Sequence, residues 1–214
     1  MKFESVIWDW NGTLLNDRHV AVNIINQLLN DRDLRRITID QYLDVFTFPV
    51  RDYYEKIGFD LVNEPFEVPA NQFISNYNKA VKSCLLHNNA IPILLRLQKL
   101  GCRQFILSAM EQNQLEKTAL DCGISHFFED LSGLDNHFAI SKVENGIRLI
   151  RNRNLIPELT VLIGDTIHDY EVAQAIGCEC VLIAHGHQSR KRLEKTGVKI
   201  LENLDEVESA ITNL

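Results

Sequence analysis

The residues most able to do chemistry lie near the start of the chain, where residues 9–13 read DWNGT directly after the apolar residues 6–8. An apolar run of strand length that ends in such residues is typical of a buried strand. Its last carboxylate emerges at the carboxyl edge of a parallel sheet, where open α/β sheets bind ligands. Asp9 is therefore a candidate nucleophile. Gly12 lets the backbone turn tightly, so that amide groups can approach an anion.

Four further polar residues stand at the ends of elements expected later in the chain. Ser108 follows the apolar residues 105–107, and Lys142 stands at the start of an expected helix. Asp165 follows the clearest buried strand, residues 159–164, and Asp169 comes four residues later. Because the carboxyl ends of parallel strands lie on the same side of a sheet, we expect these groups to converge with Asp9.

This set of side chains suits phosphoryl transfer to a carboxylate nucleophile, in which positioning and charge neutralisation supply most of the catalysis. Asp9 and Asp165 offer hard oxygen ligands for Mg²⁺, which would offset repulsion between a carboxylate and a phosphate. Ser108 can donate a hydrogen bond to the phosphate. Lys142 adds a positive charge at a helix N-terminus, which already favours anions.

The elements that must position these groups fall into two blocks. Residues 16–88 show helical patterns over 16–34, 51–57 and 70–86, with a capping box predicted at Thr38 and Gln41, and no convincing strand. From residue 90 the pattern alternates, with strands expected over 103–108, 127–131, 159–164 and 180–184, and helices over 91–100, 112–122, 141–152 and 170–176. This alternation predicts an α/β fold with a parallel sheet. We expect a core of residues 1–15 and 89–214, interrupted by an α-helical cap of residues 16–88.

With these motifs in place, the chain resembles the haloacid dehalogenase superfamily of aspartate-nucleophile hydrolases, in the branch with a helical cap after the first motif. The layout is most similar to phosphoglycolate phosphatase-like enzymes. Residues 9–14 resemble the first motif, Ser108 the second, Lys142 the third, and Asp165 with Asp169 the fourth. The resemblance implies a Rossmann-like core and catalysis in the cleft between cap and core.

The resemblance also implies a role for each site residue. Asp9 would form an aspartyl-phosphate, and Mg²⁺ would bind Asp9, the backbone carbonyl of Asn11, and Asp165. Asp169 would join the metal ligands or orient Lys142. The substrate implied is a small phosphorylated metabolite.

Asn11 departs from the family pattern, because phosphatases of this family usually carry there a second Asp that moves protons to the leaving group and from water. An amide cannot transfer those protons. We favour a slow or specialised phosphatase. Three alternatives stay open: a phosphonatase-like hydrolase of C–P bonds, with Lys56 or Lys79 forming a Schiff base; a phosphate-ligand binding protein with little turnover; and an introduced substitution at residue 11. Dehalogenation is disfavoured, because Asp165 and Asp169 indicate a retained metal.

Composition narrows the remaining classes of function. The chain has 45% hydrophobic and 24% charged residues and a net charge of -7, as in an ordinary globular protein. The basic residues near 190–195 are interrupted by acids, which disfavours nucleic-acid binding. No apolar run approaches a membrane span, and the start leads directly into a strand, so we expect a cytoplasmic protein without membrane association. The five cysteines are read as reduced thiols, and His168, His185 and His187 as rim or loop residues. The oligomeric state is left open.

Overall fold

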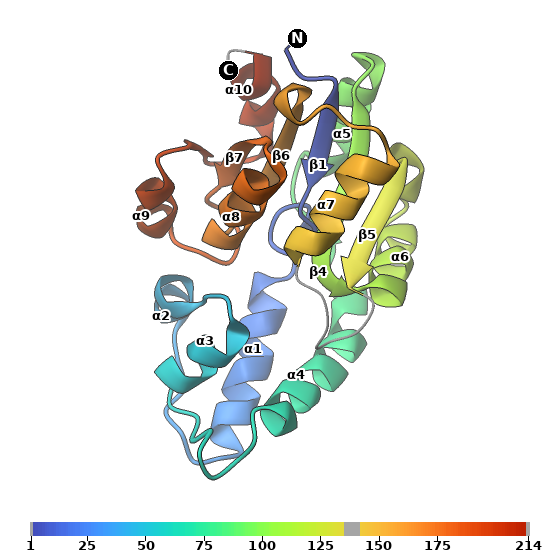
Figure 1. The fold of residues 1–214 in the computed structure, drawn as a ribbon. Helices are drawn as coiled ribbons and strands as arrows, with labels where there is room; N and C mark the ends of the chain where they lie inside the picture. The colour runs from blue at the N-terminus through green and yellow to red at the C-terminus, as the bar shows by residue number, and fades with distance from the viewer. Residues whose placement is uncertain (1, 135–141, 213–214) are drawn as a thin grey trace.

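The computed structural model of the chain describes residues 2–134 and 142–212 (Figure 1). Residue 141, the expected first residue of the helix 141–152, lies outside them. Within the described part, no helix is both long and apolar enough to cross a membrane.

The core is a parallel sheet of six strands, in the order β5-β4-β1-β6-β7-β8 (Figure 1). The first strand of the chain thus lies in the middle, paired with β4 on one side and β6 on the other. The strands are β1 (Ser5–Trp8), β4 (Arg103–Glu111), β5 (Asp130–Leu134), β6 (Thr160–Gly164), β7 (Glu179–Ile183) and β8 (Lys199–Leu201). This arrangement confirms the predicted Rossmann-like α/β fold.

Helices cover both faces of the sheet, which explains why β1 is buried throughout and is apolar from Val6 to Trp8. Val6 and Trp8 face a cluster that includes residues of α5, α6 and α10, whereas Ile7 faces residues of α7, α8 and α9. These helices are α5 (Ala90–Lys99), α6 (Gln112–Asp121), α7 (Lys142–Asn152), α8 (Ile167–Ile176), α9 (Arg190–Leu193) and α10 (Val207–Thr212). A strand buried on both faces has no polar alternation and fixes the register of its neighbours.

The four α-helices between residues 16 and 85 lie beyond the carboxyl edge of the sheet (Figure 1). They are α1 (Arg18–Asn30), α2 (Ile39–Val45), α3 (Val50–Lys56) and α4 (Glu67–Ala80). They share a separate apolar cluster that contains Ile25, Tyr42 and Tyr53. The capping box predicted at Thr38 and Gln41 is present. We call helices α1 to α4 and the segments between them the cap; its division from the core at residues 15/16 and 88/89 stays a prediction.

Short 3-10 helices complete the secondary structure of the described residues: Val81–Ser83, Ser125–Phe127, Pro157–Leu159, Glu194–Thr196 and Leu204–Glu206. They lie at the ends of helices or next to strands.

Three expectations about strands differ from the structure. The strand expected over 127–131 begins only at Asp130, because residues 125–127 form a 3-10 helix. The segment 16–88 contains a short strand, β3 (Leu85–Leu86), which pairs antiparallel with β2 (Leu15–Asn16) where the chain leaves and re-enters the core. Two residues are too few to show an alternating pattern in sequence, so pairing between the crossing segments decides their conformation. In addition, β4 does not end at Ser108 but continues to Glu111, through an irregular register with β5.

Candidate active site

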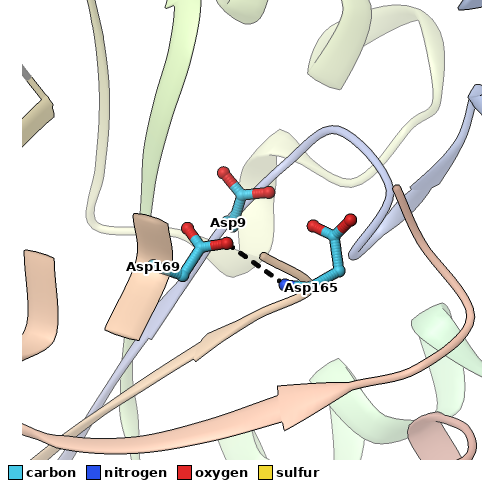
Figure 2. A group of neighbouring side chains, drawn as sticks. All are labelled: Asp9, Asp165 and Asp169. Carbon is cyan, nitrogen blue, oxygen red and sulfur yellow. Dashed lines mark hydrogen bonds between the residues drawn. The ribbon is translucent and has the colours of Figure 1, made fainter. Parts of the chain in front are cut away.

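Three aspartates gather at the carboxyl edge of the sheet, as the strand order requires. Asp9 follows β1, Asp165 follows β6, and Asp169 lies in the first turn of α8. Each offers an oxygen within 4.8 Å of the others, and all three side chains are buried (Figure 2). The Asp169 Oδ2 accepts from the backbone N–H of Asp165 at 3.2 Å and from the Thr166 hydroxyl at 2.7 Å. These two hydrogen bonds hold the Asp169 carboxylate next to Asp165.

Lys142 supplies positive charge to this cluster from the start of α7. Its ammonium group donates to the carboxylates of both Asp9 and Asp169, and only 4% of the lysine is exposed. Burial alone would lower the lysine's pKa, but the carboxylates of Asp169 and Asp9 raise it above the ordinary value. Lys142 therefore stays protonated at any pH at which the protein would work.

The carboxylates respond differently to this burial. The pKa of Asp9 is raised well above its ordinary value, first by desolvation and then by the charges of Asp169 and Asp165, against the opposing effect of Lys142. Desolvation and Asp169 also raise the pKa of Asp165, to about 6, against the opposing effect of His187. Burial would raise the pKa of Asp169 too, but Lys142 lowers it below the ordinary value. More negative charge is thus buried than Lys142 alone neutralises.

The donor set fits a magnesium ion. Hard carboxylate oxygens are the ligands that Mg²⁺ prefers, and it is usually held by one or two carboxylates with water and substrate completing its shell. Asp9 and Asp165 would hold it, with Asp169 close enough to join them. The raised pKa values of Asp9 and Asp165 have the sense expected of carboxylates that lack a counterion. The ligand assignment, including the carbonyl of Asn11, stays a prediction.

Asn11 and Ser108 lie together beside this cluster. The Asn11 amide donates from Nδ2 to the Tyr77 hydroxyl at 2.7 Å and to the Asp17 carboxylate at 3.0 Å. Its Oδ1 faces the Ser108 hydroxyl at 3.5 Å. Ser108 is fully buried and also accepts from the backbone N–H of Met110, so its hydroxyl is held against Asn11.

Asp17 is a functional candidate that sequence reasoning missed. Its buried carboxylate accepts hydrogen bonds from Asn11, the backbone N–H of Gly12 at 2.8 Å, the Tyr77 hydroxyl at 2.5 Å and His187 Nε2 at 3.1 Å. Although burial would raise the pKa of Asp17, His187 and the other donors lower it. An aspartate at the start of a helix is most often only a cap, so nothing in the sequence distinguished this one.

Only a glycine at position 12 lets the backbone come so close to the side chains of Asp165 and His187. Its φ of +78° lies in the left-handed region, and a Cβ here would stand 2.4 Å from both Asp165 Oδ2 and His187 Cδ2. Gly12 thus lies beside the aspartate cluster, but its backbone N–H already donates to Asp17 and is not free to bind a phosphate.

His187 was noticed in the sequence but read as a loop residue. It is buried between Asp17 and the Tyr42 hydroxyl, which lies 2.8 Å from its Nδ1, and its backbone N–H donates to Asp165 at 2.6 Å. Burial would lower the pKa of His187, but Asp17 raises it to about 9. His168 lies at the rim as expected, stacked on Phe48, and His185 stacks on His87.

A cleft of about 760 Å³ opens above Asp9, Asn11, Lys142 and Asp169, between the cap and the sheet edge. Its volume is in the range of small-molecule sites. The cap lysines considered for a Schiff base, Lys56 and Lys79, are exposed and are not among the described residues that line this cleft.

Fold and site together agree with a comparison against known families. A model of the haloacid dehalogenase-like hydrolases matches residues 6–183, and the chain belongs to this family.

Individual relatives are distant. The tyrosine-protein kinase PtkA of Mycobacterium tuberculosis is 23% identical over 210 residues, which are 96% of this chain and 72% of PtkA. A solved structure of that protein superposes with a TM-score of 0.82 at 22% identity, covering 97% of each chain. A predicted phosphoglycolate phosphatase from Haemophilus somnus gives a TM-score of 0.79 at 18% identity, covering 99% of each chain. These likenesses show the fold that the sequence predicted.

The His187–Asp17 pair predicts how stability depends on pH. Because the pKa of His187 in the folded protein is about 9, above the 6.5 of a free imidazole, its contribution is complete below about pH 6.5 and is lost as the pH rises through 9. We expect the melting temperature of the metal-free protein to fall between about pH 7 and about pH 10. His187→Gln should be less stable at neutral pH and should lose most of this slope. An equal slope in both proteins would contradict the assignment.

The aspartate cluster predicts a metal response. A ligand that binds only the folded state stabilises by about 2.7 kcal/mol at 100 times its dissociation constant, so excess Mg²⁺ should raise the melting temperature by several degrees. Asp165→Asn should remove most of this shift. Glu171→Gln, which changes an exposed carboxylate at the rim, is the matched control and should keep it. An unchanged shift in Asp165→Asn would show that the cluster does not hold the ion.

Proposed function

We propose that the chain is a Mg²⁺-dependent phosphatase that hydrolyses a small phosphorylated compound through an aspartyl-phosphate on Asp9. One observation carries the proposal: Asp9, Lys142 and Asp169 converge, buried, at the floor of a cleft in a chain of the hydrolase family, and the buried Asp165 lies directly beside them. Buried like charges with a single cation are costly for stability, and such groups gather where they have a function.

Each residue has a role in the proposed reaction. Asp9 attacks the phosphorus atom, and the leaving group departs in line with it. Lys142 lies between Asp9 and Asp169, where its charge would stabilise phosphate oxygens. The Thr13 hydroxyl donates to Asp165 at 2.9 Å and lies 3.3 Å from Asp9, which orients both carboxylates. When bound, Mg²⁺ would neutralise the negative charge shared by Asp9 and the phosphate.

Asn11 is the weak point of this reaction. The two donors of its amide are already bonded to Asp17 and the Tyr77 hydroxyl, and an amide cannot give the leaving oxygen a proton. Loss of general acid-base catalysis costs about 10²- to 10⁴-fold. Turnover should therefore be slow unless the leaving group departs easily as an anion.

Two other candidates share the same site. A binding protein would use the phosphate contacts without turnover. The name of the mycobacterial relative, tyrosine-protein kinase, suggests transfer from Asp9 to a phenol hydroxyl instead of water, and the aromatic cleft favours this candidate. Release of inorganic phosphate supports hydrolysis, whereas phosphotyrosine formed on an added acceptor supports transfer.

The phosphonatase alternative has no cap lysine in the described lining to support it.

Substitutions at Asp9 and Asn11 test the mechanism. With Mg²⁺ and p-nitrophenyl phosphate we expect weak activity in the native protein and a loss of at least about 10³-fold in Asp9→Asn, because the nucleophile is removed. Asn11→Asp would place a carboxyl about 3 Å from Asp17, where one of the pair must hold a proton. We therefore expect a gain of about 10- to 100-fold in kcat together with a lower melting temperature.

Asn78→Asp is the matched control, because Asn78 also lines the cleft and changes in the same way. It should show no gain. Activity that survives in Asp9→Asn would contradict the nucleophile. If neither the native protein nor Asn11→Asp releases phosphate, yet a phosphate ligand raises the melting temperature, the binding function is correct.

A further inference from the structure

The walls of the cleft are aromatic, whereas its floor is charged. Eight phenylalanine and tyrosine side chains of the cap line it, from α2, α3, α4 and the segments before α3 and α4. Phe46 and Phe48 are only half-buried, so part of each ring is left to the cleft. They meet edge to face with ring centroids 5.5 Å apart, and Phe48 also stacks on His168 at 4.7 Å. Flat rings that remain partly open favour a flat apolar ligand.

The charged groups around the cleft have partners already. Among the described lining residues, the basic side chains are Arg51, Lys142, His168 and His187. Arg51 lies 3.3 Å from Glu55, and His168 lies 3.3 Å from Glu171. Lys142 and His187 are paired with buried aspartates. The cleft therefore offers one place for a phosphate and no unpaired cation, within the described lining, for a carboxylate or a second phosphate.

One polar group on the apolar wall lacks a partner. Tyr53 is 98% buried, as its relative exposure of 2% shows, and lines the cleft. Its hydroxyl is a buried polar atom with no hydrogen-bond partner in the described structure. A buried polar atom without a partner is costly, and this hydroxyl is such an atom within the apolar wall.

Asn11 gives an independent reason for the same kind of ligand. Without a proton donor the leaving group must depart as an anion, and the pKa of a phenol is about 10 whereas that of water, close to that of alcohols, is about 16. A phenolate is thus a far better leaving group than an alkoxide.

We propose that the substrate is an aryl phosphate, the phosphate monoester of a phenol with no further anionic group close to the ring. This inference rests on the proposed phosphatase function. The Asp9 carboxylate forms the new O–P bond while the aryl O–P bond breaks, and the electron pair leaves with the phenolate, which takes a proton from water. Water then attacks the phosphorus atom, the O–P bond to Asp9 breaks, and the proton of water goes to the phosphate released.

The first test compares substrates. With Mg²⁺, kcat/KM for phenyl phosphate and O-phospho-L-tyrosine should exceed that for glycerol 3-phosphate and 2-phosphoglycolate by about 100-fold or more. Among substituted phenyl phosphates, kcat/KM should rise steeply as the pKa of the phenol falls, and Asn11→Asp should flatten this dependence. A phosphotyrosyl peptide is a separate arm, which distinguishes a free phenol ester from one in a polypeptide.

The second test asks whether the cleft recognises the ring. Phe48→Ala should lower kcat/KM for phenyl phosphate by about 10-fold while changing that for glycerol 3-phosphate less than about twofold, because only the ring loses contact area. Phe48→Leu, which keeps apolar volume, is the conservative variant should Phe48→Ala lose its fold. Phe128→Ala is the matched control, a half-buried phenylalanine outside the described lining, and should change neither value. Calorimetry on Asp9→Asn should show phenyl phosphate binding more tightly than glycerol 3-phosphate.

The experiments distinguish failure of the proposed substrate class from failure of the proposed phosphatase function. Asp9-dependent activity that favours alkyl phosphates, or an equal loss for both esters in Phe48→Ala, would overturn the substrate class and leave the phosphatase standing. Activity independent of Asp9, or no phosphate release from any ester by the native protein and Asn11→Asp, would overturn the phosphatase and with it this inference.

Discussion

The burial of negative charge at one edge of the sheet is the constraint on which the rest of the site depends. Four carboxylates, those of Asp9, Asp17, Asp165 and Asp169, are each at most 6% exposed. A buried carboxylate is tolerated only when it is paired and hydrogen-bonded, or when its pKa rises until it takes up a proton. Lys142 and His187 are the cations that this requirement brings to the site. The excess of negative charge that they leave is what a divalent cation would neutralise.

The burial of negative charge also explains why an amide, and not a carboxylate, stands at position 11. The two donors of its amide are directed at Asp17 and at the Tyr77 hydroxyl, and its oxygen faces Ser108. A carboxylate at this half-buried position would add a fifth acid to the site and would repel Asp17, whereas the amide donates a hydrogen bond to Asp17. The donors and acceptors around Asn11 are therefore matched, but the site lacks a side chain at this position that can transfer a proton. Because Asn11 and Asp17 are hydrogen-bonded, a substitution at either residue changes the surroundings of the other.

The sequence predicted the fold and the central cluster because both follow from short-range patterns. A buried strand that ends in a carboxylate can be recognised locally, and parallel strand order brings Asp9 and Asp165 to one edge without further information. The network around Asp17 could not be predicted in this way. Asp17, Tyr77 and His187 come from three distant segments, each residue has an ordinary structural explanation alone, and only the packing of the cap on the core brings them together. The strand pairing of Leu85–Leu86 was missed for the same reason.

The cap is therefore part of the site and more than a cover over it. Tyr77 reaches Asp17 and Asn11 from α4, and Tyr42 reaches His187 from α2. Farther along, Ser189 and Gln188 bond to the backbone of Leu43 and Phe46, which ties α2 to the loop after β7. Asp17 loses a donor if α4 moves away, and His187 loses one partner if α2 does. Because the side chains that make these hydrogen bonds are buried, the position of the cap and the charge state of the His187–Asp17 pair depend on each other. The aromatic walls and the polar floor of the cleft are thus held in one arrangement by the same few contacts, and a ligand must fit both at once.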